Sequence, residues 1–139
     1  MANKDKENIV ELLKQSVSAY NYHDIEGFIN FYTEDYIDHI NKISGREELK
    51  QYTDDYIKAF PDIKWTIKDI LVEGNKVAIR YRYKGTHQGE FMGIAPTGKK
   101  IDVNGILIAR VEGGLIAEDW DIQDTDSFLK QLGLEEFPG

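Results

Sequence analysis

The first sixty residues carry apolar side chains at helical spacing. Over residues 5–20 they recur every three or four positions, which predicts an amphipathic helix. Asp24 is a favoured N-cap residue, so a short second helix is expected to begin there. Ser44 followed by Glu47 has the spacing of a capping box, and Pro61 ends the third helix because proline cannot continue it. The chain therefore begins with three predicted helices.

The second half of the chain alternates between apolar and polar residues with a period of two. From Val77 to Tyr83 the odd positions are apolar, whereas Arg80, Arg82 and Lys84 occupy the even ones, so one face of this strand is packed and the other is wet. Turn signals at Gly74-Asn75 and Gly113-Gly114 separate the predicted strands, which cover residues 63–72, 77–84, about 100–111 and 115–123. A last short helix is expected over residues 125–132.

This order of elements predicts an α+β fold in a single domain covering residues 1–139. The apolar face of the sheet and three amphipathic helices must cover one another, so the sheet should curl around the helices. The space left between a curved sheet and its helices would be a pocket.

Composition narrows the class of protein. The chain has no cysteine, which excludes disulfides, thiolate catalysis and zinc sites built on cysteine. Because no apolar run is long enough for a signal peptide or a membrane span, a cytoplasmic protein is expected. Twenty-five acidic residues against 17 basic ones give a net charge of −8, which disfavours nucleic acid and anionic membranes as partners.

The strongest candidate chemistry lies in the stretch from Glu118 to Asp124. Asp119 and Asp121 are two residues apart in a predicted strand, so their carboxyl groups point to the same side. If that side faces the pocket, burial raises their pKa towards the range in which a carboxyl group exchanges protons with a carbonyl compound. The opposite parity, with Trp120 and Ile122 facing inward, is equally compatible with the alternation.

A second candidate region is the glycine- and proline-bent loop of residues 85–100. Strand parity continued past Gly85 places His87 on the packed side, although a bulge at Gly85 would reverse it. His87 would hydrogen-bond either a substrate oxygen or loop carbonyls. Glu90 precedes the bend and is either functional or a solvated charge. His39 lies between two predicted helices, at the rim of the pocket or in an exposed loop. These residues lack the spacing of metal-ligand pairs, so no metal is expected.

The chain resembles the SnoaL-like polyketide cyclases, a branch of the nuclear transport factor 2-like superfamily of cone-shaped α+β proteins. The similarity is carried by Tyr36-Ile37-Asp38-His39, by Gly45-Arg46-Glu47-Glu48-Leu49, by Trp120-Asp121 and above all by residues 85–98. It implies a curved sheet wrapped around the helices, a hydrophobic pocket, a homodimer and neither metal nor organic cofactor. The family's general acid/base aspartate matches Asp121. Where the family usually has histidine before Trp-Asp, this chain has Asp119.

Two functional hypotheses follow. The first is a cofactor-independent cyclase, isomerase or lyase that acts on a small hydrophobic carbonyl compound, such as a polyketide ester. In it Asp121, His87 and His39 are catalytic, and the substrate contacts Asp119, Glu90, Tyr83, Tyr36, Phe91 and Trp120. A variant is an epoxide hydrolase, which needs a charged orienting residue beside Asp121. The second is a non-catalytic module of the same fold that binds a small ligand or mediates dimerisation.

Overall fold

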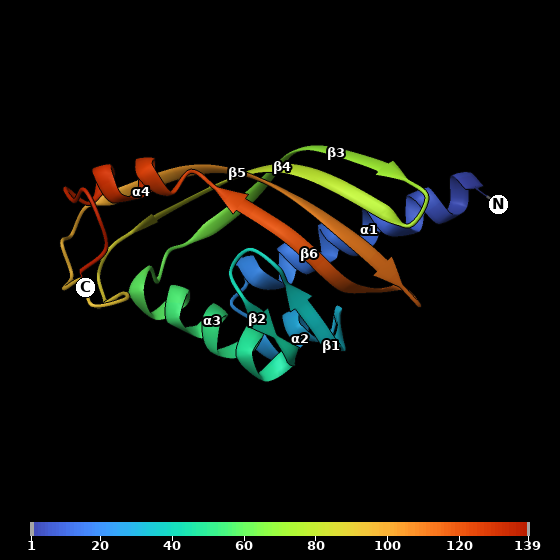
Figure 1. Cartoon of the computed structure of the whole chain (residues 1–139), viewed down its shortest axis with the longest axis horizontal. Coiled ribbons are helices and arrows are strands. Elements are labelled where there is room, and N and C mark those ends of the chain that lie inside the picture. The colour runs from blue at the N-terminus through green and yellow to red at the C-terminus, as the bar shows by residue number, and fades with distance from the viewer. Residues whose placement is uncertain (1, 139) are drawn as a thin grey trace.

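The computed structural model describes residues 2–138 as one α+β unit (Figure 1). Helices α1 (Ala2–Asn21) and α2 (Ile25–Ile29) come first, and α3 (Gly45–Ala59) follows two short strands. Those strands are β1 (Tyr32–Asp38) and β2 (Ile43–Ser44). The remaining elements are β3 (Lys64–Glu73), β4 (Lys76–Thr86), β5 (Lys100–Glu112), β6 (Leu115–Gln123) and α4 (Thr125–Gln131).

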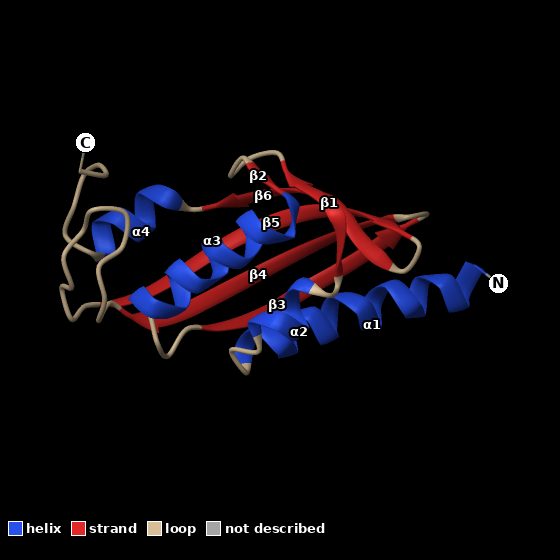
Figure 2. Ribbon diagram, turned by 90° about the horizontal axis from the view of Figure 1, so that it is seen from below, coloured by secondary structure: helices blue, strands red, loops and turns tan. Residues whose placement is uncertain are grey.

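The six strands form one curved sheet in the order β2-β1-β6-β5-β4-β3. Strands β3 to β6 are an antiparallel meander, as predicted, whereas β1 pairs with β6 in parallel. The sheet arches over helices α1, α2 and α3, which lie on its concave side (Figures 1 and 2). The α+β class and the wrapping of a curved sheet around the three helices are therefore confirmed.

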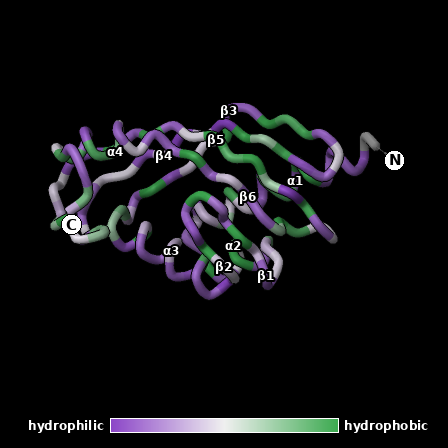
Figure 3. The backbone as a smooth tube through the Cα atoms, viewed as in Figure 1, coloured by the Kyte–Doolittle hydropathy of each residue, from purple (hydrophilic) through white to green (hydrophobic). Residues whose placement is uncertain are grey.

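Alternation along the strands separates the two faces of the sheet. On β4 the side chains of Val77, Ile79, Tyr81 and Tyr83 are buried, and the intervening side chains are half-buried or exposed. Buried residues of the helices belong to the same core, and α3 consists mostly of hydrophilic residues (Figure 3). The core consequently lies between the concave sheet face and the helices, as the sequence predicts.

Two details of the prediction were wrong. Strands β1 and β2 were assigned to helix and connecting segments, and they add two strands to the predicted meander of four. Ser44 caps α3 without a capping box at Glu47, because its backbone N–H donates to Oε1 of Glu48 at 2.9 Å. The N-cap at Asp24 is confirmed, since its side chain accepts a hydrogen bond from the Gly27 N–H at 3.0 Å.

The convex sheet face carries both charge and apolar surface. Arg80 and Arg82 pair there with Asp69 and Asp102, and Ile106, Ile108 and Ile122 are 44–60% exposed. The homodimer implied by the family resemblance stays a prediction, and this face offers apolar surface for it. Among the described residues, no helix is both long and apolar enough to cross a membrane.

Candidate functional site

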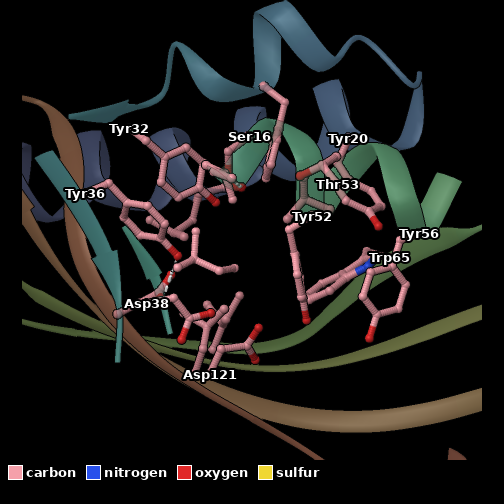
Figure 4. Close-up of a pocket in the computed structure, with 18 of the residues that line it drawn as sticks. Ser16, Tyr20, Tyr32, Tyr36, Asp38, Tyr52, Thr53, Tyr56, Trp65 and Asp121 are labelled. Atoms are coloured by element: carbon pink, nitrogen blue, oxygen red, sulfur yellow. Dashed lines mark hydrogen bonds between the residues drawn. The ribbon is translucent and has the colours of Figure 1, made fainter. Parts of the chain in front are cut away.

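A cavity of about 70 Å³ lies between the concave sheet face and the helices (Figure 4). All six strands and helices α1, α2 and α3 contribute to its lining, for example through Tyr20 on α1, Tyr36 on β1, Tyr52 on α3, Trp65 on β3 and Asp121 on β6. For comparison, a cavity that holds a single buried water has a volume of about 10–15 Å³. The cavity thus has room for a small ligand group in its present form, and its walls are mostly aromatic and aliphatic.

Strand β6 presents Asp119 and Asp121 to this cavity. Their side chains are only 5% and 9% exposed, although both are carboxyl groups. They pair in register with Ala109 and Leu107 of β5, which face the core as well. The parity that puts both aspartates inside is therefore the correct one, and the alternative with Trp120 and Ile122 inside is rejected.

Asp119 is bonded to Tyr36, which sequence reasoning expected only as a substrate contact. The Tyr36 hydroxyl lies 2.9 Å from both carboxyl oxygens of Asp119. Burial, followed by the negative charges of Asp38 and Asp121, raises the pKa of Asp119 to about 8, although the Tyr36 hydrogen bond opposes the increase. Near neutral pH the Asp119 carboxyl group is therefore mostly protonated and able to donate a hydrogen bond.

Asp121 has a separate tyrosine partner. The hydroxyl of Tyr81 on β4 donates to Oδ1 of Asp121. Burial raises the pKa of Asp121 to about 7; the Tyr81 hydrogen bond lowers it and the Asp38 charge raises it. A carboxyl group with a pKa near the working pH can both accept and return a proton, which is what general acid/base catalysis requires.

A glycine makes the Tyr81–Asp121 contact possible. Gly105 is opposite Tyr81 in the β4–β5 ladder, and a Cβ atom there would lie 2.3 Å from the Tyr81 ring and hydroxyl. Since Tyr81 is fully buried, its ring has little room to move away. The absence of a side chain at position 105 is what lets the Tyr81 hydroxyl reach Asp121.

Asp38 is a third buried carboxyl group at the same cavity, and it was not singled out as a site residue from the sequence. It is 3% exposed, and its oxygens accept hydrogen bonds from the Ile40 N–H, the Asn41 N–H and the Asn41 side-chain amide at 2.7–3.0 Å. All three donors are uncharged. Asp38 thus places a negative charge beside Asp119 and Asp121, and no ion pair with it is formed among the described residues.

His87 does not meet Asp121 across the cavity. It is fully buried as strand parity predicts, but its ring stacks on Phe60 and is not part of the cavity lining. Its Nδ1 accepts a hydrogen bond from the Thr97 N–H at 3.2 Å. Its backbone N–H donates to the Lys99 carbonyl, and its own carbonyl accepts from the Gly98 N–H. The geometry is that of a histidine that anchors the loop, and burial lowers its pKa. The catalytic assignment of His87 therefore has no support from this placement.

Two further predicted contacts belong to the same loop and not to the cavity. Glu90 is exposed, and its Oε1 accepts from the Gly93 N–H at 3.0 Å, so it stabilises the turn. Phe91 is buried against Tyr56, Phe60 and Phe128. Neither side chain lines the cavity, so their expected substrate contacts find no support in the geometry.

His39 and Trp120 lie on the opposite side of the sheet. Their rings stack with centroids 4.8 Å apart, and Nε2 of His39 is 2.7 Å from Oε1 of Glu118. Arg110 completes this surface cluster through Glu118. The placement of these two residues at the pocket was wrong, because the parity that turns Asp119 and Asp121 inward turns Trp120 outward.

Tyr83 does line the cavity, where its hydroxyl donates to Oε1 of Gln123. Gln123 is a lining residue that a parity argument could have found from sequence, because it continues the inward series of Asp119 and Asp121. Asp38 could not be found in this way, because its strand β1 was not predicted. Tyr20, Tyr52 and Trp65 gave no comparable signal, because core aromatic residues have the same spacing. Within residues 2–138 no three His, Cys, Asp or Glu residues are arranged to hold a metal ion.

Solved structures with the same fold include proteins named as cyclases and one named as a hydroxylase. AclR from Streptomyces galilaeus, a candidate hydroxylase, is 32% identical and superposes with a TM-score of 0.81 over 92% of this chain and 96% of its own. IdmH from Streptomyces antibioticus, a candidate polyketide cyclase, is 30% identical with a TM-score of 0.77 over 90% and 98%. A candidate polyketide cyclase from Bacillus cereus is 30% identical with a TM-score of 0.81 over 98% and 87%.

No curated protein is a significant match to the chain. The family description "SnoaL-like polyketide cyclase" matches residues 10–132, which include the cavity-lining aspartates and all six strands of the sheet. The chain belongs to the SnoaL-like polyketide cyclase family.

Proposed function

We propose that this protein is a cofactor-independent cyclase that uses Asp121 as a general acid/base on a small hydrophobic carbonyl compound. One observation carries the proposal: Asp121 is a buried carboxyl group that faces a cavity lined by aromatic and aliphatic side chains, with its pKa raised to about 7. Family membership and the cyclase names of two relatives support the reaction class.

The chemistry begins with ionised Asp121 removing a proton from the carbon next to a carbonyl group. The C–H electron pair moves into the enolate, so negative charge develops on the carbonyl oxygen. Protonated Asp119 is the neutral donor available to that oxygen, because its raised pKa keeps its proton near neutral pH. Donors aimed at developing charge in a dry site are among the strongest sources of catalysis.

Ring closure follows if the enolate carbon attacks a second carbonyl group of the same molecule. The new C–C bond leaves an alkoxide, which takes back the proton now held by Asp121. Proton count and charge then balance without any cofactor. Holding both carbonyl groups in one cavity makes the attack intramolecular and oriented, which lowers its entropic barrier.

The epoxide-hydrolase variant is less well supported by the geometry. It requires a charged residue that orients Asp121, yet the hydrogen-bond partner of Asp121 within the described chain is the neutral Tyr81 hydroxyl. The non-catalytic alternative would gain support if Asp121 faced bulk water or if aromatic side chains filled the cone. Asp121 instead faces a cavity that is not filled.

A panel assay separates these possibilities. Wild type and Asp121→Asn are incubated with uncharged diketones, keto esters and epoxides, and products are identified by mass spectrometry. We expect a ring-closed or isomerised carbonyl product from wild type and a loss of about 100-fold or more in the variant. Undiminished turnover in a folded Asp121→Asn protein would remove Asp121 from the mechanism, and a diol product would favour the hydrolase.

A further inference from the structure

The charged side chains that line the cavity are all acidic. Three carboxyl groups line it, those of Asp38, Asp119 and Asp121, and none of the described lining residues is lysine, arginine or histidine. Arg80, Arg82 and Arg110 bond to acids on the other face of the sheet, and Arg46 of α3 donates to the backbone oxygen of Tyr32. A ligand that enters this cavity therefore meets acidic side chains and no cationic side chain among the described lining residues.

Much of the rest of the wall is aromatic, and aliphatic residues such as Leu49, Ile79 and Leu107 complete it. Figure 4 shows Tyr20, Tyr32, Tyr36, Tyr52 and Trp65 around the space, with Asp38 and Asp121 at one side of it. The faces of aromatic rings carry partial negative charge and attract cations within about 6 Å of the ring centroid. Ring faces and carboxyl groups consequently favour the same kind of ligand.

The cavity also holds polar atoms that have no partner. The side chains of Tyr32 and Thr53 are 8% and 2% exposed, yet their hydroxyl groups form no hydrogen bond with other described residues (Figure 4). The Trp65 Nε1 atom is likewise buried without a partner. Buried polar groups are normally satisfied, so these atoms point to a ligand with a polar part.

We propose that this cavity binds a compact organic cation, an alkylated ammonium group of about the size of choline. An alkylated ammonium presents methyl groups to the aromatic walls and makes little demand for hydrogen bonds. Its charge is balanced by the carboxylates, whereas an anion of the same shape would face like charge in a dry site. Binding needs only this charge and shape, so it does not depend on the proton transfer proposed above.

Proton linkage gives the binding a distinctive pH dependence. The groups that face Asp119 and Asp121 are Asp38, Tyr32 and Tyr36 from β1, Tyr81 from β4, Tyr52 and Tyr56 from α3 and Tyr20 from α1. Burial raises the pKa of each of these tyrosines, so they stay neutral through the neutral range. A cation favours ionised Asp119 and Asp121, so its binding releases protons and strengthens as the pH rises from about 6 to about 8.5.

Three ligands of one branched shape test the proposal by isothermal titration calorimetry. Choline is cationic, 3,3-dimethylbutan-1-ol is its uncharged counterpart and 3,3-dimethylbutanoate is anionic. At pH about 8.5 we expect choline to bind at least about tenfold more tightly than the alcohol, which is the size of a desolvated cation–π contribution. The advantage should shrink towards pH about 6, and buffers of different ionisation enthalpy should reveal the released protons.

Variants locate the effect. Asp119→Asn and Asp121→Asn should each weaken choline binding more than alcohol binding and flatten the pH dependence of choline binding. Asp69→Asn, on the other sheet face, is the matched control and should change neither. Equal affinity for choline and the alcohol, tighter binding of the anion, or no choline binding at about 10 mM would overturn the proposal. A cavity that prefers the uncharged alcohol would still accept the uncharged carbonyl substrate of the proposed reaction. Failure of the cation-binding proposal can therefore be distinguished from failure of the proposed cyclase reaction.

Discussion

The hydroxyl of Tyr36 lies 2.9 Å from each carboxyl oxygen of Asp119, although the two residues are 83 positions apart in sequence. The contact exists because β1 runs parallel to β6, with Asp38 opposite Asp119 in the register. This pairing brings Tyr36, Asp38 and Asp119 to one end of the cavity. A hydrogen bond from Tyr36 lowers the pKa of Asp119, against the larger effect of burial.

Tyr36→Phe should therefore raise the pKa of Asp119 above about 8. The carboxyl group loses the donor that stabilises its ionised form, and the protein should lose about 1–3 kcal/mol of unfolding free energy. Carboxyl ¹³C chemical shifts measured against pH would report the pKa directly. Tyr32→Phe is the control, because the Tyr32 hydroxyl has no hydrogen bond to lose. A pKa that is unchanged in Tyr36→Phe would show that the hydroxyl does not act on Asp119.

Gly105→Ala should act on Asp121 through Tyr81. The added Cβ atom occupies the place of the Tyr81 hydroxyl, so the ring must shift and its bond to Asp121 is lost. Without that bond the pKa of Asp121 should rise above about 7, as it should in Tyr81→Phe. The two variants should agree in the direction of the shift in the same NMR titration. A normal Asp121 titration in Gly105→Ala would mean that the glycine has no such role.

The raised pKa values of Asp119 and Asp121 should make the protein less stable as the pH rises. Asp119 and Asp121 have folded-state pKa values raised to about 8 and about 7, so the folded protein holds protons that the unfolded chain releases near pH 4. Each group removes up to about 1.4 kcal/mol per pH unit between pH 4 and its own folded pKa.

Urea unfolding of wild type and of the Asp119→Asn, Asp121→Asn double variant, from pH 5 to pH 8.5, measures this loss of stability as the difference between their unfolding free energies. Burial lowers the pKa of His87, which acts in the opposite sense because the unfolded chain binds that proton more readily. Subtracting the Asp119→Asn, Asp121→Asn double variant cancels the His87 contribution. We expect wild type to lose stability relative to the double variant with rising pH. A constant difference would contradict the raised pKa values.

We expect His87 to contribute substantially to stability and His39 to contribute little. His87→Ala removes a fully buried ring that stacks on Phe60 and anchors the loop, so about 2–4 kcal/mol of stability should be lost. His39→Ala removes a surface pair with Glu118 and should cost less than about 1 kcal/mol. Folded protein of either variant should keep the proton-transfer activity of wild type. A large loss of that activity in folded His87→Ala would restore its predicted catalytic role.

The sequence was most informative where apolar and polar residues alternate without interruption. The alternation around Val77 and the turns at Gly74 and Gly113 predicted strands β3 to β6 to within one or two residues at each end. Strand β1 was missed because Glu34 and Asp35 interrupt its alternation and its register with β6 shifts between Tyr32 and Ile37. Its partner is also distant in sequence, and local patterns carry no information about such a pairing.

The same limits explain the site. The i and i+2 spacing of Asp119 and Asp121 established that they share a face, but only packing against the helices shows which face is buried. Trp120 made the opposite parity attractive, since a tryptophan on a strand is commonly a core residue. Its stacking on His39 at the outer surface could not be anticipated without β1 in place.

The central claim is that Asp121 removes a proton next to a carbonyl group, and deuterium exchange tests it without knowledge of the natural substrate. Small uncharged ketones and keto esters are incubated with the protein in D₂O, and loss of the α-proton signal is followed by ¹H NMR. We expect wild type to exceed the buffer rate, with a pH dependence that rises through about 7, and Asp121→Asn to fall by about 100-fold or more. Exchange at the wild-type rate in folded Asp121→Asn would contradict the claim.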